Sequence, residues 1–216
     1  MKKLAEQFLS QHEREKITET VQRMEQVTSG EIVPMVVTAS HNYPTASVAG
    51  GLFLTIPLAL LLTSLLGSTL WLGSQNMWLF LAFSAILFFP FRYLVSKNVT
   101  LTRMFLPGSQ VQEEVEEAAI TAFYGEGLYR TRDENGILVF VSVLERKVWI
   151  LADRGINEKI EPDLWQDIVA ELTRGIKTGK QGEALCQAIT QVGNVLQDHF
   201  PIKEDDTDEL RNIIIG

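Results

Sequence analysis

The sequence lacks charge over one long stretch. No Asp, Glu, Lys or Arg occurs from Ile32 to Phe91, a run of sixty residues, although 21% of the whole 216-residue chain is charged. Globular domains carry about 25% charged residues. An uncharged run of this length therefore excludes an ordinary water-exposed surface for these residues.

Two further deficits narrow the class of protein. The chain has one cysteine, Cys186, which excludes an internal disulfide framework and fits a reducing compartment. Lys and Arg number 19 against 27 Asp and Glu, so the net charge is −8. Nucleic-acid binding requires a basic surface. We therefore expect no nucleic-acid partner.

Two apolar blocks fill the uncharged run, at about 48–72 and 77–95. Each is close to the roughly 20 apolar residues that a helix needs to cross a bilayer. Only Gly73–Asn76 separates them, so the two helices are antiparallel. Neither block has the polar stripe of a soluble helix. The sequence predicts a transmembrane hairpin over 44–97, with the lipid bilayer as a partner.

Details within the blocks refine this prediction. Pro57 lies inside the first block, where Thr55 is close enough to satisfy the carbonyl that proline frees. Small residues offer close approach to a partner helix; they are Gly50, Gly51, Ser64 and Gly67.

Basic residues predict the orientation of the hairpin. The turn contains none, whereas both outer ends carry several: Lys2, Lys3, Arg14, Lys16 and Arg23 before it, and Arg92, Lys97 and Arg103 after it. The positive-inside rule then places both termini in the cytoplasm. No cleavable signal peptide is recognisable. We expect a two-pass integral membrane protein with a cytoplasmic soluble domain.

The remaining segments predict one α/β domain interrupted by the hairpin. Residues 1–43 read as a helix that ends at Thr28-Ser29-Gly30, followed by a strand at 31–38. Residues 98–202 read as a helix, strands at 137–144 and 147–152 joined by Glu145-Arg146, and two helices; residues 203–216 form a solvated acidic tail. A lone strand is not stable. We therefore expect the strand at 31–38 to pair with the later strands.

Three short strings resemble the TPM domain family. They are Thr28–Val33, Glu134–Val139 and Glu145–Ile150, and the similarity extends over about 1–40 and 110–200. The resemblance implies a small TPM-like sandwich of helices and sheet, here with the transmembrane hairpin inserted. It also implies divalent-ion binding and modest acid-phosphatase activity, which some members have.

By this resemblance, two loops would hold an ion. Asp133, Glu134 and Asn135 precede the second strand, and Asp153 and Asn157, with Glu158 nearby, follow the third. Hard oxygen ligands of this kind suit Ca²⁺ or Mg²⁺. The alternative is that Asp, Asn and Gly are ordinary turn residues.

The sequence departs from the family pattern in both loops. Asp-Glu-Asn-Gly replaces Asp-Asn-Gly, and Asp153-Arg154-Gly155 replaces Gly-Tyr-Gly. Arg154 either binds phosphate as a fork or neutralises the extra acid.

Two functions remain. No standard phosphatase, P-loop, zinc-protease or serine-hydrolase motif occurs in the sequence. The first hypothesis is an interaction or maintenance factor for a membrane protein complex. The second is a metal-dependent phosphatase at the acidic loops. The segment 175–182, with three glycines and two lysines, is either a phosphate or lipid-headgroup contact or a plain helix connector.

Overall fold

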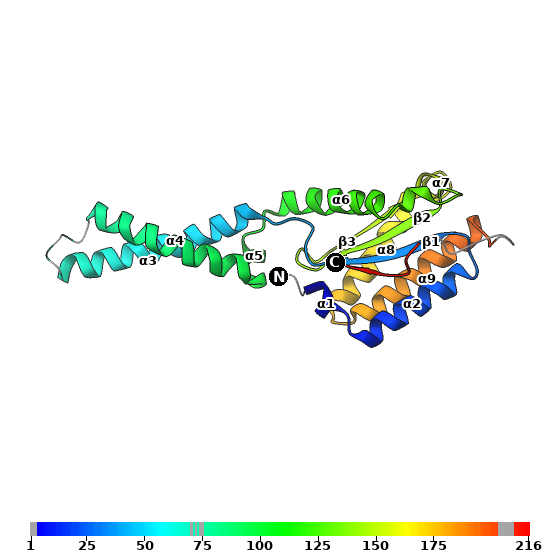
Figure 1. Cartoon of the computed structure of the whole chain (residues 1–216), viewed down its shortest axis with the longest axis horizontal. Helices are drawn as coiled ribbons and strands as arrows, with labels where there is room; N and C mark the ends of the chain where they lie inside the picture. The colour runs from blue at the N-terminus through cyan, green and yellow to red at the C-terminus, as the bar shows by residue number, and fades with distance from the viewer. Residues whose placement is uncertain (1–3, 70, 72, 74–75, 203–209) are drawn as a thin grey trace. The chain divides into compact units, whose positions relative to one another are not determined.

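The computed structural model describes residues 4–69, 71, 73, 76–202 and 210–216. The chain divides into a hairpin unit, residues 42–111, and an α/β unit formed by the segments before and after it. Figure 1 shows the elements of both units. Several predicted features lie outside the described residues: Lys2, Lys3, the Ser74-Gln75 part of the turn, and residues 203–209 of the acidic tail.

A four-stranded sheet in the order β3-β2-β1-β4 forms the centre of the α/β unit. β1 (Glu31–Val37) runs parallel to β2 (Gly136–Ser142), in register from Glu31↔Gly136 to Val37↔Ser142. β2 pairs antiparallel with β3 (Lys147–Ala152). The strand before the hairpin thus pairs with the strands after it, as expected, because its apolar side chains need both faces covered.

The C-terminus is not wholly a solvated tail. β4 (Ile214–Ile215) pairs parallel with β1 at Met35 and Val36, and the Gly216 N–H donates to the Val36 carbonyl at 3.0 Å. The prediction of an acidic tail over 203–216 was therefore wrong for its last residues. Three consecutive isoleucines favour a strand, and Ile213 and Ile215 pack against the core.

The short β4 also explains a proline in a central strand. Val36 and Thr38 direct their backbone groups toward β4, so Pro34, two residues earlier, turns its nitrogen to the same side. The ladder with β4 begins only at Met35. Pro34 therefore occupies a position that needs no N–H donor.

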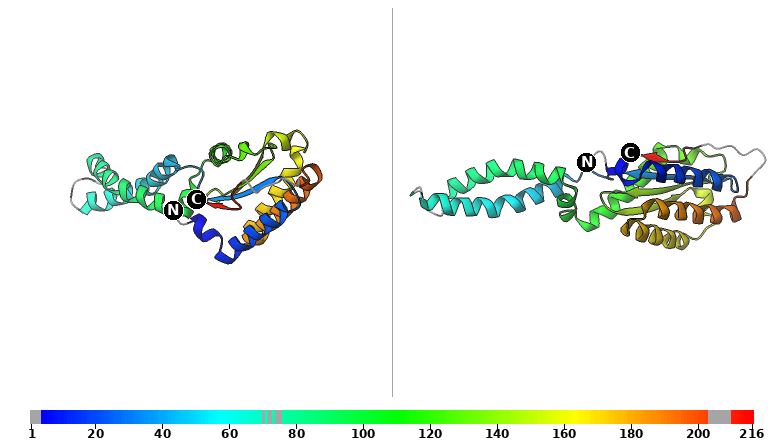
Figure 2. Two further views of the ribbon diagram at one scale, coloured as in Figure 1. Left: turned by 45° about the vertical axis from the view of Figure 1, so that its right-hand side comes forward. Right: turned by 90° about the horizontal axis from the view of Figure 1, so that it is seen from below.

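Helices cover both faces of the sheet. α2 (Gln11–Glu25), α8 (Pro162–Lys177) and α9 (Gln181–His199) lie on one face, and α6 (Gly108–Gly125) lies on the other (Figures 1 and 2). Short helices complete the unit: α1 (Leu4–Phe8), η1 (Leu128–Arg130) and α7 (Arg154–Asn157). The hydrophobic core includes five fully buried residues: Ile17, Ile32, Ile137, Leu185 and Ile189. This arrangement is the predicted α/β sandwich.

Two local predictions were wrong. α2 ends at Glu25, and Gly30 is not its cap: a Cβ there would lie 2.7 Å from Leu196 Cδ1, so this glycine allows close approach to α9. The β2–β3 connection has four residues, 143–146, instead of two. The N–H groups of Val143 and Leu144 donate to the carbonyls of Val37 and Thr38, so these two residues continue beside β1 and belong to the connection instead of the ladder with β3.

The hairpin unit consists of α3 (Pro44–Thr69), α4 (Met77–Lys97) and the short α5 (Val99–Met104). α3 and α4 are long and apolar enough to cross a membrane. The division of the chain places α5 with the hairpin, whereas the sequence-based boundary was at 97.

α3 packs along α4 through small residues. Its buried positions recur every fourth residue: Ser47, Gly51, Thr55, Ala59, Thr63 and Gly67. A Cβ on Gly51 would lie 3.1 Å from Arg92 Cα, so the two backbones are close there. Gly50, Gly51 and Gly67 are therefore buried inside the unit, and Ser64 alone of the predicted approach points is exposed.

The hydroxyl of Thr55 does not compensate for Pro57. Thr55 Oγ1 is buried and has no hydrogen-bond partner among the described residues. The nearby Thr63 instead donates to the Ala59 carbonyl at 2.7 Å. Large apolar side chains point outward from both helices, including Phe53, Ile86 and Phe89, each about two-thirds exposed.

Candidate functional site

The two predicted acidic loops meet at one end of the sheet. The Gly155 N–H donates to the Glu134 carbonyl at 3.1 Å. A Cβ on Gly155 would lie 2.7 Å from the Glu134 carbonyl oxygen and 2.9 Å from that of Asp133. The loops contact because β2 begins where the antiparallel β3 ends, and glycine is needed at this contact.

The two asparagines of the predicted site hold backbone in place. Asn135 is buried, and its Nδ2 donates to the Ser29 carbonyl, which ties the loop before β2 to the segment before β1. Asn157 Nδ2 donates to the Ala152 carbonyl at 2.8 Å. These bonds support the turn-residue interpretation for both side chains.

Asp153 differs from the other predicted site residues. Its Oδ1 accepts from the Arg154 N–H at 2.7 Å and caps α7. Its Oδ2 is buried and has no hydrogen-bond partner among the described residues. A buried carboxylate oxygen without a donor is unfavourable. Asp153 is therefore the position at which a cation would be most stabilising.

Glu134 and Arg154 are the residues at which the two loops depart from the family pattern. Glu134 has φ +51°, a left-handed conformation that is unfavourable for a residue with a Cβ. Arg154 Nε donates to Glu158 Oε1 at 2.8 Å. Glu158, and then Glu134, raise the pKa of the Arg154 guanidinium above its ordinary value. Of the two roles considered for Arg154, neutralising nearby acid is favoured over a free phosphate fork.

The described residues fit a divalent ion only in part. No group of three or more His, Cys, Asp or Glu side chains in the described ranges is gathered closely enough to hold a metal. The loops offer the Asp153 Oδ2 atom and, beside Gly155, the backbone carbonyls of Asp133 and Glu134. Ca²⁺ takes six to eight oxygen ligands. A bound ion would thus need water or further loop oxygens.

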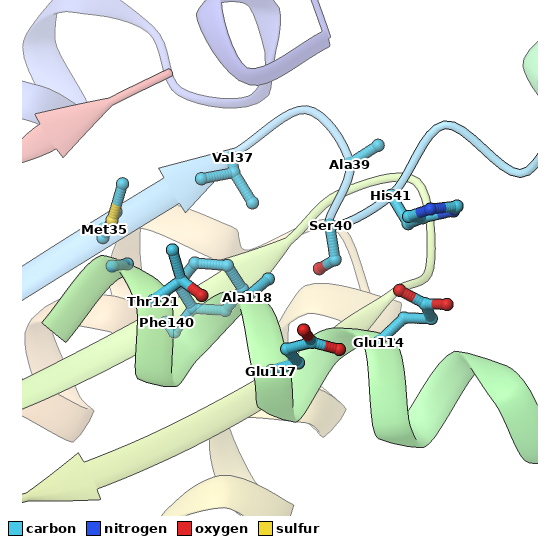
Figure 3. A pocket seen from close by; sticks show the side chains of 11 residues that line it. Met35, Val37, Ala39, Ser40, His41, Glu114, Glu117, Ala118, Thr121 and Phe140 are labelled. Atoms are coloured by element: carbon cyan, nitrogen blue, oxygen red, sulfur yellow. The ribbon is translucent and has the colours of Figure 1, made fainter. Parts of the chain in front are cut away.

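A pocket of about 580 Å³, lined by both polar and apolar side chains, lies between α6 and the end of β1 with the residues that follow it (Figure 3). Glu114 and Glu117 come from α6, and Ser40 and His41 come from the segment after β1. The Ser40 N–H donates to Glu145 Oε1 at 2.9 Å, while Ser40 Oγ is buried without a described partner. Two carboxylates disfavour a phosphate ester here. This pocket was not predicted from the sequence, although it lies at the carboxyl end of a parallel strand, where ligands often bind.

A larger groove of about 680 Å³ follows β3, between α6 and α8. Its lining is mostly apolar and includes Trp149, Ile150, Trp165 and Val169. The groove was not predicted from the sequence either. Residues such as Trp149 and Ile150 occur in strands that line a groove and in strands that are covered, so the residue types do not distinguish the two.

Comparisons with known proteins identify the class to which this fold belongs. The family model for the TPM domain matches residues 99–195. The chain is also similar to the NMR structure of the BA42 protein from the psychrophilic bacterium Bizionia argentinensis, at 21% identity and a TM-score of 0.59, over 96% of this chain and 94% of that one. No curated protein matches the chain. Residues 99–195 therefore match the TPM domain family, and the chain has a TPM-like α/β fold together with two helices that are long and apolar enough to span a membrane.

Proposed function

We propose that the protein is a membrane-anchored interaction factor, in which the hairpin crosses the bilayer and the TPM domain acts on a membrane protein complex from the cytoplasm. The outward apolar surface of α3 and α4 carries this proposal. Small residues face inward and large apolar ones outward, the reverse of a soluble helix pair.

Aromatic and basic residues support the spanning arrangement. Trp71 and Trp78 are highly exposed beside the turn, and Tyr93 is exposed near the other end, where Lys97 Nζ lies 5.7 Å from its ring centroid. Aromatic belts and basic cytoplasmic flanks are typical of membrane interfaces.

A cysteine-labelling experiment tests the topology. In a Cys186→Ser background, a cysteine at Ser74 should react with an impermeant thiol reagent on intact cells. A cysteine at Lys16, in α2, should react only after lysis. Labelling of position 74 only after lysis would contradict the proposed orientation.

The interaction role is tested by native electrophoresis of membranes solubilised in mild detergent. We expect the full-length protein to migrate with a larger complex and to cross-link to one of its subunits. Migration at the size of the protein alone, with no cross-linked product, would refute this role.

Asp153 Oδ2, buried and without a hydrogen-bond donor in the part of the chain that the structure describes, favours a second candidate, divalent-ion binding at the two acidic loops. Ca²⁺ or Mg²⁺ should raise the melting temperature of the wild type and of Asp198→Asn, a control on the exposed side of α9, but not that of Asp153→Asn. Calorimetry without heat for either ion would remove the candidate. A phosphatase activity would depend on this ion, and turnover of p-nitrophenyl phosphate should then disappear with EDTA and in Asp153→Asn.

A further inference from the structure

The groove along β3, hereafter the β3 groove, exposes the edge of the sheet. β3 is the terminal strand in the order β3-β2-β1-β4, and among the described residues no strand pairs with its outer side. α6 lines one side of the groove and α8 lines the other. An exposed strand edge within such a groove is where an extended peptide can add to a sheet.

The pairing with β2 shows which backbone groups point into the groove. The Asp153 N–H donates to the Gly136 carbonyl at 2.8 Å, so in this antiparallel ladder residues 147, 149, 151 and 153 bond to β2. The backbone groups of Val148 and Ile150 therefore point outward. The Ala152 carbonyl also points outward, but Asn157 Nδ2 already donates to it. Two consecutive outward positions remain for a peptide.

The side chains of the groove would accept apolar residues on both sides of an added strand. Ile150 packs toward the core side, near Trp165 and Val169 of α8, whereas Trp149 faces the α6 side. Trp165 is 7% exposed, and its Nε1–H has no acceptor among the described residues. The groove wall therefore also contains a buried indole N–H, to which a bound peptide would supply an acceptor.

One end of the groove is basic in an otherwise acidic protein. Arg146, Lys147 and Lys177 line it there, where β3 begins and α8 ends. Lys147 Nζ donates to the neutral Gln112 Oε1 at 3.3 Å. None of the three forms an ion pair with a carboxylate within the described part of the chain. A partner with negative charge at this end would be complementary.

We propose that the β3 groove binds an extended segment of a partner protein, with alternating apolar residues and an acidic C-terminal end. The segment would run antiparallel to β3, which places its carboxyl end beside Arg146 and Lys147. Six residues of β3 correspond to about 20 Å of extended peptide. This inference rests on the proposed interaction function and identifies its surface. A second copy of the chain is disfavoured, because α6 and α8 flank the edge on both sides.

Peptide binding to the full-length protein in detergent micelles tests the inference. The probe is a fluorescein-labelled octapeptide of alternating threonine and valine that ends in two aspartates and a free carboxylate. We expect it to bind at least tenfold more tightly than the same peptide ending in two lysines. A version with N-methyl groups on alternate residues, which cannot donate to β3, should not bind. No binding of the acidic peptide, or equal binding of the three, would overturn the inference.

Two variants locate the binding site. Lys177→Glu should weaken the acidic peptide about fivefold, whereas Lys16→Glu, an equal charge change on the exposed side of α2, should not. Ile150→Pro removes an outward N–H without breaking the ladder with β2, and it should abolish binding. If that variant does not fold, the N-methyl peptide reports on the same hydrogen bonds. Equal weakening by Lys16→Glu and Lys177→Glu would contradict the assignment.

Native electrophoresis separates failure of this inference from failure of the proposed function. A larger complex that persists while the peptide does not bind refutes the β3 groove and leaves the interaction role intact. Loss of both refutes both. A dimer that the acidic peptide does not dissociate, together with no peptide binding, would show that a second copy occupies the edge and would also overturn the inference.

Discussion

The hairpin unit and the α/β unit place small and large side chains in opposite positions. In α3 the buried residues are glycine, alanine, serine and threonine, and the large exposed ones are leucine, isoleucine and phenylalanine. In the α/β unit the fully buried residues include Phe140, Ile17 and Leu185, whereas Glu31 is the one buried charged residue among those described. Water drives large apolar groups inward. In the bilayer that we propose surrounds the hairpin, no such force acts between helices, so close backbone packing would take its place.

The largest expected effect comes from removing a large side chain from each unit. Ile189→Ala, at a fully buried position of α9, should lower the free energy of unfolding of the α/β unit by about 2–5 kcal/mol. Leu60→Ala, at an exposed position of α3, should change hairpin stability by less than about 0.5 kcal/mol. Hydrogen exchange is followed as a function of urea concentration, and the unfolding midpoints of peptides from each unit give the two changes in stability. Similar losses would contradict the contrast.

The reverse substitution should affect the hairpin. Gly51→Leu places a side chain against the Arg92 backbone and should destabilise the contact between α3 and α4 by about 1–3 kcal/mol. Spin labels at Leu52 and Tyr93, in a Cys186→Ser background, should then show a broadened distance distribution. Ser64→Leu adds the same side chain at an exposed position and serves as the control. Broadening in both variants would argue against a specific small-residue contact.

The C-terminal strand gives a smaller effect. Ile215→Ser should destabilise the α/β unit by about 1–2 kcal/mol, because Ile215 packs against the core and pairs with Val36. Ile202→Ser, at a half-exposed position outside the sheet, should have little effect. Thermal unfolding in detergent distinguishes the two, and equal melting temperatures would mean that β4 contributes nothing.

Glu134→Gly should be stabilising. Glycine adopts φ +51° without a Cβ penalty, and the gain should be about 0.5–1 kcal/mol after the added entropy of the unfolded chain. Glu113→Gly, in the interior of α6, should instead cost about 1 kcal/mol. Both are measured by urea unfolding with EDTA present, so that ion binding does not contribute. A destabilised Glu134→Gly would refute strain at this loop.

The smallest expected effect depends on pH. The Ser10 backbone N–H and hydroxyl donate to Glu13 Oε2 at 2.8 and 2.7 Å and lower the pKa of this carboxyl from its ordinary value of 4.5. Its stabilisation is therefore complete above about pH 4.5 and is lost as the pH falls through the lower pKa of the folded state. Glu13→Gln should cost about 0.5 kcal/mol at pH 7 and nothing in strong acid. Urea titrations of the wild type and Glu13→Gln across pH measure this difference, and a cost that stays the same from pH 7 to strong acid would contradict the assignment.

The predictions from sequence succeeded where one physical signal dominates. The uncharged run located α3 and α4, and Pro162 marked the start of α8. They failed where long-range contacts decide. Gly30 resembled a helix cap, but its neighbour is Leu196, far away in the sequence. The predicted β2–β3 turn was too short. Val143 and Leu144 continue a strand-like sequence but bond to the segment at the end of β1 and not to β3, which only the tertiary structure decides.

The candidate site divides in the same way. The residue types in the two acidic loops were evident from the sequence, and the loops do meet at Gly155. Asn135 and Asn157 are bonded to backbone carbonyls, while Asp153 Oδ2 has no donor within the described ranges; both facts depend on distances that no local pattern contains.

Composition alone determined the division of this chain into a part without charges and a part with them, because burying a charge in an apolar medium is costly for any fold. Only the tertiary structure decided which of the strands would be an edge and which loops would meet. Those choices depend on pairings between segments separated by the whole hairpin, since Val37 and Ser142 lie side by side more than one hundred residues apart.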